Sequence, residues 1–98
     1  MERELHLITR RGDGRGWESV AFAHRAGGRP VVVLAGEAVA ESEESVQGLL
    51  GGRPSAADLP ILAVREDARG AGLGERWAVV DYAALLDLLL EAGVAVCW

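Results

Sequence analysis

Cysteine, lysine and asparagine are scarce or missing in this chain of 98 residues. It has one cysteine and two histidines, and it has no lysine and no asparagine. One cysteine cannot form a disulfide within the chain, which excludes a disulfide-rich scaffold. The same counts exclude a four-ligand Cys/His zinc site within one chain. The lack of lysine excludes a Schiff-base enzyme and a lysine-bearing phosphate loop.

Acidic residues outnumber basic ones, and half of the residues are hydrophobic. The 15 Asp and Glu residues against ten arginines leave a formal net charge of −5, which argues against nucleic acid as a direct partner held by charge. A hydrophobic share of 50% is too high for a disordered chain. The length suits a single domain over residues 1–98 with one modest core.

The apolar runs of the sequence are short. Two glutamates precede the first run, which stops at Thr9, so a signal peptide is not expected. No run approaches the ~20 residues of a membrane-spanning helix. We therefore expect a cytoplasmic protein without membrane association.

Apolar runs and capping residues alternate regularly along the chain. The run at residues 31–35 has no polar alternation, which is typical of a parallel strand covered on both faces. Strands are predicted at residues 5–9, 31–35, 61–64, 78–80 and 94–97. Helices are predicted at residues 17–26, from the cap Ser42 to about 50, at 66–72 and at 82–92 after the cap Asp81, with a glycine-rich turn at 10–16 and a loop at 53–59. This order predicts one three-layer α/β domain, in which about five mostly parallel strands are flanked by helices.

The first and last predicted helices carry more apolar surface than one core needs. In the last helix the apolar side chains cover roughly 200° of the circumference, against the ~100° stripe that a surface helix buries. In the first helix Glu18 and Arg25 mark the polar side, which Trp17 and Phe22 flank. A large core with scattered exposed apolar side chains is one interpretation, but we favour a subunit interface in so small a fold. The predicted interface residues are Trp17, Phe22, Leu86, Leu90 and Trp98.

The glycine-rich turn at residues 12–16 and the two histidines are candidates for chemistry. Glycines between a strand and a helix can hold a phosphate at the helix N-terminus, but G-x-G-x-G is not the dinucleotide fingerprint. We therefore favour a flexible turn, with an anion site as the alternative. His6 in the first strand and His24 on the first helix could act as bases, yet no nucleophile is near either in sequence, and we favour packed or partly exposed histidines.

Acidic residues follow three of the predicted strands. Glu37 follows the second strand, Asp67 the third and Asp81 the fourth. They could converge at the carboxyl edge of the sheet, together with Arg10, and form a site there. Helix capping and interaction with helix dipoles explain Asp67 and Asp81 without a function, and we favour that interpretation.

Cys97, the single thiol of the sequence, ends the last predicted strand. If that strand is parallel to the others, Cys97 also lies at the carboxyl edge of the sheet. A reactive thiol needs a lowered pKa, and the sequence near Cys97 offers no base. We expect a small buried hydrophobic side chain instead. We assign no catalytic residue, no metal ligand and no cofactor.

Short motifs along nearly the whole chain resemble the TusB/DsrH family. In the carboxyl half these are Ile61-Leu-Ala-Val-Arg-Glu-Asp, Gly72-Leu73 and Val79-Val80-Asp81-Tyr82, followed by a leucine-rich helix and Trp98. In the first half they are Leu5-His6 at the first strand and the run 31–36 with an acidic residue after it. The resemblance implies the DsrE-like fold for a single domain of this length, with about five mostly parallel strands flanked by helices.

The resemblance also implies a function in sulfur transfer. Members of the family are small subunits of hetero-hexameric sulfur-relay complexes, which pass persulfide sulfur toward 2-thiouridine at the wobble position of tRNA or serve sulfur trafficking in sulfur oxidisers. Some members carry a cysteine on the first helix, but the matching stretch 17–23 has Val20 and no thiol. The resemblance therefore implies an accessory, non-catalytic subunit whose partners are other DsrE-like subunits of the TusC/TusD or DsrF/DsrE type. The alternatives are a homo-oligomeric module that binds a small anion and a persulfide carrier that uses Cys97.

Overall fold

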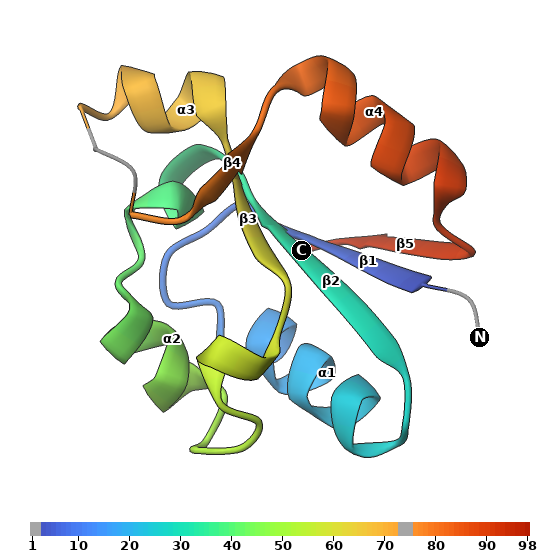
Figure 1. The fold of residues 1–98 in the computed structure, drawn as a ribbon. Coiled ribbons are helices and arrows are strands. Elements are labelled where there is room, and N and C mark those ends of the chain that lie inside the picture. Colours follow the sequence, from blue (N-terminus) through green and yellow to red (C-terminus); the bar gives the residue numbers. More distant parts are fainter. Residues whose placement is uncertain (1–2, 73–75) are drawn as a thin grey trace.

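The computed structural model describes residues 3–72 and 76–98 of the chain. In these ranges the strands are β1 (Arg3–Ile8), β2 (Arg29–Leu34), β3 (Ile61–Val64), β4 (Ala78–Val80) and β5 (Val94–Cys97). The α-helices are α1 (Gly14–Arg25), α2 (Glu43–Leu49), α3 (Arg65–Gly70) and α4 (Tyr82–Glu91), and the short 3-10 helices are η1 (Gly36–Ala40) and η2 (Ala56–Asp58) (Figure 1).

The described strands form one parallel sheet in the order β4-β3-β2-β1-β5. The central strand β2 is buried along the run from Val31 to Leu34, because helices cover both of its faces. β5 lies parallel to β1, with Ala95 beside Leu5 in register. The predicted α/β class, with five parallel strands flanked by helices, is therefore confirmed.

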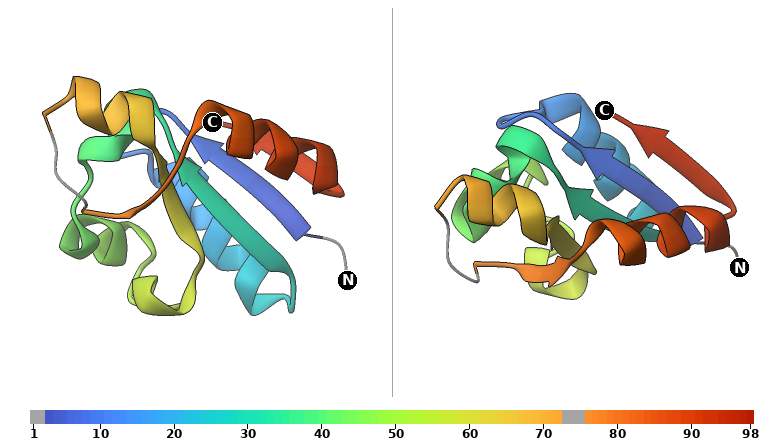
Figure 2. Two further views of the ribbon diagram at one scale, coloured as in Figure 1. Left: turned by 45° about the horizontal axis from the view of Figure 1, so that its top comes forward. Right: turned by 90° about the horizontal axis from the view of Figure 1, so that it is seen from above.

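The helices form two unequal layers. α1 and α2 pack on one face of the sheet, and α4 crosses the other face (Figures 1 and 2). The chain moves outward from β1 to β4 and then returns to the far side of β1, and right-handed crossovers place the returning helix on the opposite face. The face under α4 is less completely covered, so that Leu7 and Leu62 on this face are half-buried.

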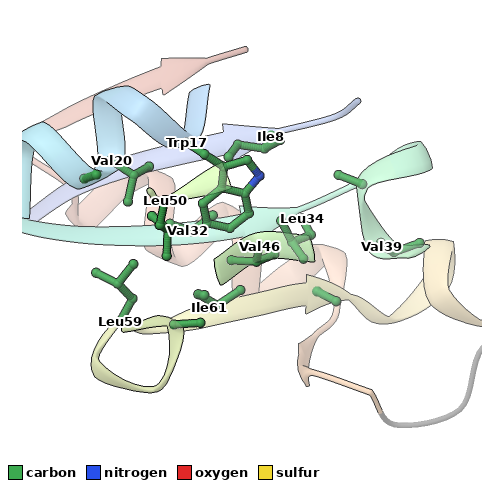
Figure 3. Close-up of a cluster of buried hydrophobic side chains, with 14 of the residues drawn as sticks. Ile8, Trp17, Val20, Val32, Leu34, Val39, Val46, Leu50, Leu59 and Ile61 are labelled. Carbon is green, nitrogen blue, oxygen red and sulfur yellow. The ribbon is translucent and has the colours of Figure 1, made fainter. Parts of the chain in front are cut away.

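The larger hydrophobic core lies between the sheet and the two helices α1 and α2, and it contains Trp17 (Figure 3). The residues Trp17, Val20 and Ala21 follow the spacing of one helical stripe and are all buried against the sheet. The prediction that Trp17 belongs to an interface is wrong, because its side chain is 0% exposed. α1 turns the indole inward and leaves Phe22 on the surface.

α4 covers its face of the sheet with a half-buried apolar stripe. Leu85, Leu88 and Leu89 pack against a cluster that includes Val31 and Val33 of β2. Within this fully described helix no residue is buried. The wide apolar arc is thus divided between a face that rests on the sheet and a face that stays exposed.

The start of α1 differs from the prediction for a local reason. The helix begins at Gly14 rather than at Trp17, so the end of the predicted turn is helical. The Asp13 carboxylate accepts the N–H of Gly16 at 3.0 Å, and the Asp13 carbonyl oxygen accepts the N–H of Trp17. An N-cap of this kind starts a helix even in a glycine-rich segment.

The other predicted boundaries agree with the structure within two residues. Ser42 caps α2 through the N–H of Ser45 at 3.0 Å, as predicted. Asp81 caps α4 through the N–H of Ala84 at 2.8 Å, which confirms the capping interpretation for this residue. The predicted loop at 53–59 contains the short helix η2.

Candidate functional site

The glycine-rich segment lies at the carboxyl end of β1, beside the end of β5. The direction of the strand connections reverses at β1, and parallel α/β folds hold ligands at such points. Here the backbone amides are already bonded to carboxylates of the protein. The N–H of Gly12 donates to Oε2 of Glu41 at 2.7 Å, and the N–H of Gly16 donates to Asp13. These two amides are therefore occupied and do not point at an open anion site.

Glu41, at the end of η1, is the residue at this edge that sequence reasoning missed. It is 2% exposed although it is acidic. Its Oε1 accepts the hydroxyl of Ser45 at 3.0 Å and lies 3.8 Å from Nε of Arg11. Its backbone carbonyl accepts the indole N–H of Trp77 at 2.9 Å. A buried carboxylate needs such partners, but in the sequence the run 41–44 is indistinguishable from an exposed acidic helix start.

His6 and Trp98 connect the middle of β1 to the residue that follows β5. The indole N–H of Trp98 donates to Nδ1 of His6 at 3.2 Å, and the planes of the two rings differ by 3°. In the neutral imidazole the hydrogen is therefore on Nε2, which lies 3.8 Å from Oε2 of Glu4. Burial lowers the pKa of His6, and the charge of Glu4 opposes this effect. His6 is thus a packed, neutral histidine that holds Trp98.

The carboxyl edge brings Asp67 and Glu66 of α3 to Tyr82 at the start of α4. The Asp67 carboxylate accepts the N–H of Gly36 at 2.9 Å and the phenol O–H of Tyr82 at 3.1 Å. Oε2 of Glu66 lies 3.4 Å from the backbone nitrogen of Tyr82. The hydrogen bond to Asp67 and the negative charge of Asp67 raise the pKa of the Tyr82 phenol. These contacts tie α3 to the starts of η1 and α4.

The other members of the predicted acidic group do not join this cluster. Asp81 serves as a helix cap. Glu37 and Arg10 are exposed, and in the described ranges no side-chain hydrogen bond or ion pair links either of them to Asp67. Glu37, Asp81 and Arg10 therefore do not form a common site with Asp67 at this edge of the sheet.

Cys97 ends strand β5 at the carboxyl edge, beside Leu7 in register. Its side chain is exposed, so the expectation of a buried residue is wrong. The reason is that β5 is an edge strand, with β1 as its single neighbour among the described strands. Thiols at helix N-termini are activated by the helix dipole, whereas Cys97 is in a strand.

An apolar surface lines the open edge of the sheet at β5, and we call it the β5 flank. Its members are the exposed apolar side chains around this edge: Phe22 of α1, Leu86 and Leu90 of α4, and Val94 of β5. Their exposed fractions are 69%, 56%, 77% and 49%, respectively. Figure 2 shows β5 at the outer edge of the sheet, with α1 and α4 on its two sides.

The position of Leu88 shows which way this side of α4 faces. Leu88 lines a hollow together with Leu62 of β3, so it faces the β2–β3 side of the sheet. Leu86 and Leu90 are two residues before and after Leu88, about 200° away around the helix. They therefore face away from β3, toward the β5 edge. Of the other predicted interface residues, Trp98 is half-buried and lines a shallow hollow of about 570 Å³ with Phe22.

The described residues contain no group of three or more His, Cys, Asp and Glu side chains that could hold a metal ion. Within the same residues no helix has both the length and the apolar character to cross a membrane. Of the motifs that carry the family resemblance, Leu73 lies outside the described residues. Comparison with protein-family models, with curated proteins and with solved structures finds no match for this chain.

Proposed function

We propose that this protein is an accessory, non-catalytic subunit of a sulfur-relay complex that resembles TusB/DsrH. It docks other DsrE-like subunits, of the TusC/TusD or DsrF/DsrE type, and supports persulfide transfer toward tRNA 2-thiolation or related sulfur trafficking. The parallel three-layer fold is compatible with this proposal. The position that bears a cysteine in some relatives holds Val20, which is buried in the core, so the sulfur would be carried by a partner.

The β5 flank is the observation that carries the proposal. Natural edge strands are commonly protected by charge or proline, but the sequence Val-Ala-Val-Cys of β5 has neither. Exposed apolar side chains stand on both sides of this edge. Burying a fully exposed leucine or phenylalanine side chain contributes about 1.5–3 kcal/mol, and Phe22, Leu86 and Leu90 are each only part-exposed, so together they offer roughly 3–6 kcal/mol before the costs of association. A surface of this kind favours a docking function over catalysis.

Co-expression with DsrE-like subunits of the TusC and TusD types tests the proposal. We expect one stable assembly, measured by light scattering after size-exclusion chromatography. Leu90→Ser and Phe22→Ser should disrupt this assembly, because each places a polar group on the β5 flank. Ala57→Ser, at an exposed position in η2, is the matched control and should leave the assembly intact.

The second measurement is the rate at which persulfide sulfur passes between the partner subunits. Addition of this chain should raise that rate, and Leu90→Ser should abolish the increase. Assembly that is unaffected by both flank substitutions would show that docking uses another surface. A transfer rate that does not respond to this chain would refute the sulfur-relay role.

A further inference from the structure

A hollow lies at the amino ends of β1, β2 and β3, at the end of the sheet away from the glycine-rich segment. Its volume is about 370 Å³, near the lower end of the range for small-molecule sites. Its apolar wall consists of Pro30, Val31, Pro60, Leu62 and Leu88. It stays open because α4 is the helix that covers this face, and Figure 1 shows the starts of β2 and β3 outside its cover.

Two arginines line this hollow side by side. Arg3 of β1 and Arg29 of β2 are register partners in neighbouring parallel strands, so their Cα atoms lie about 4.8 Å apart and their side chains share one face. Like charges directly opposite one another are unfavourable. In the described ranges neither arginine forms an ion pair with an acidic side chain. An anion between them would remove this repulsion.

Other residues with charged or ionisable side chains also surround the hollow. His24 at the end of α1 is also in the lining. Asp58 of η2 is the acidic side chain of the lining. Glu4 lies on the opposite face of β1, but its carboxylate is close to Gly28, another lining residue. Two arginines therefore line the hollow together with one acidic residue, Asp58.

We propose that this hollow binds a small phosphomonoester with an apolar organic part. Arg3 and Arg29 can each donate paired hydrogen bonds to the oxygens of a phosphate, and their combined charge of +2 exceeds the single negative charge of Asp58. A phosphate dianion gains more from two guanidinium groups than a singly charged carboxylate ligand does. Val31, Leu62 and Leu88 then contact the organic part of the ligand. The site is separate from the β5 flank, and the inference does not depend on the proposed function.

Amide chemical shifts followed by NMR during a titration test this proposal, with phenyl phosphate, inorganic phosphate and benzoate as probes at low salt. Phenyl phosphate should shift the amides of Gly28, Val31 and Leu62, and it should bind more tightly than either of the other two probes. Binding of inorganic phosphate as tight as that of phenyl phosphate would refute a role for the apolar wall. Equally tight binding of benzoate would refute selection for a dianion.

Substitutions of the exposed arginines separate this site from general attraction of anions. Arg3→Gln and Arg29→Gln should each weaken binding of phenyl phosphate by about tenfold or more, as expected when one charged hydrogen-bond donor is lost. Arg69→Gln removes the same charge from the exposed surface of α3 and should have no such effect. Asp58→Asn should strengthen binding. Equal affinities in all four variants, or shifts outside the hollow, would overturn the proposal.

Discussion

Substitution of Glu41 tests whether a buried carboxylate holds the glycine-rich segment in place. Its two oxygens accept different donors, the N–H of Gly12 at 2.7 Å and the hydroxyl of Ser45 at 3.0 Å. Glu41→Ala removes both acceptors and leaves the Arg11 guanidinium without its carboxylate. The Arg11 pair contributes little, because Arg11 is 62% exposed and such pairs are worth about 0–1 kcal/mol.

The two hydrogen bonds of the Glu41 carboxylate determine how much stability Glu41→Ala removes. A hydrogen bond to a charged group contributes about 1.5–3 kcal/mol, so the pair amounts to about 3–6 kcal/mol. Removal of the carboxylate also relieves its desolvation, which offsets several kcal/mol. We expect Glu41→Ala to lower the free energy of unfolding by about 2–3 kcal/mol, which for a domain of this size lowers the melting temperature by roughly 10–20 °C.

Glu41→Gln separates charge from hydrogen bonding. The amide oxygen can still accept the N–H of Gly12, and the amide nitrogen can donate to the Ser45 hydroxyl, which accepts as well as it donates. We expect a loss of about 1 kcal/mol. Glu37→Ala, at an exposed acidic position of η1, is the control and should change stability by less than about 0.5 kcal/mol.

Urea denaturation measures these differences, and hydrogen exchange at the Gly12 amide reports on the local bond. Exchange at Gly12 should accelerate in Glu41→Ala and stay slow in Glu37→Ala. The reasoning is refuted if Glu41→Ala is as stable as the control, since the desolvation of the carboxylate would then equal what its hydrogen bonds contribute.

Three further predictions follow from other parts of the structure. Burial lowers the pKa of His6 below 6.5, so the stability that the neutral imidazole provides is complete above pH 6.5 and declines as the pH falls toward the lowered value. Urea denaturation across this range should show the free energy of unfolding falling more steeply with decreasing pH in the wild type than in His6→Gln. The same pH dependence in both proteins would contradict this prediction. The isolated chain should form at least a dimer at tens of micromolar, and Leu86→Ser with Leu90→Ser should shift it toward the monomer in sedimentation; a monomeric wild type in the absence of partners would count against the β5 flank as a self-contact. Under the proposed accessory function, Cys97→Ala should raise persulfide transfer between partner subunits as much as the unsubstituted chain. A sulfur adduct on Cys97 that moves to a partner, detected by mass spectrometry after loading by a cysteine desulfurase, would instead make the protein a carrier.

The sequence was sufficient for the features that depend on neighbours along the chain. The apolar run at 31–35 has the character of a central parallel strand, and it became one because nothing polar interrupts it. Ser42 and Asp81 cap helices because a cap bonds an amide three residues later, which is a local relation. The five strands and the α/β class follow from such local patterns, and the described part of the chain agrees with both.

The direction in which a side chain faces needed the tertiary structure wherever a helix carries apolar residues on several sides. Trp17 and Phe22 both flank the polar side of α1, yet one is buried and the other is exposed. Trp17 is the buried one because the sheet packs against the side of α1 that carries Val20 and Ala21, and Phe22 lies off this side. Cys97 is exposed for a similar reason, since the strand order places β5 at an edge, and local sequence does not state that order.

The charged groups that matter most were also invisible to sequence reasoning. Glu41 is buried because η1 carries it over the glycine-rich segment, 29 residues away from its partner Gly12. Arg3 and Arg29 are neighbours because parallel pairing aligns the starts of two strands. Sequence patterns describe distances along the chain, whereas burial and electrostatic interaction depend on distances in space, and the crossovers between parallel strands set those distances only in the folded protein.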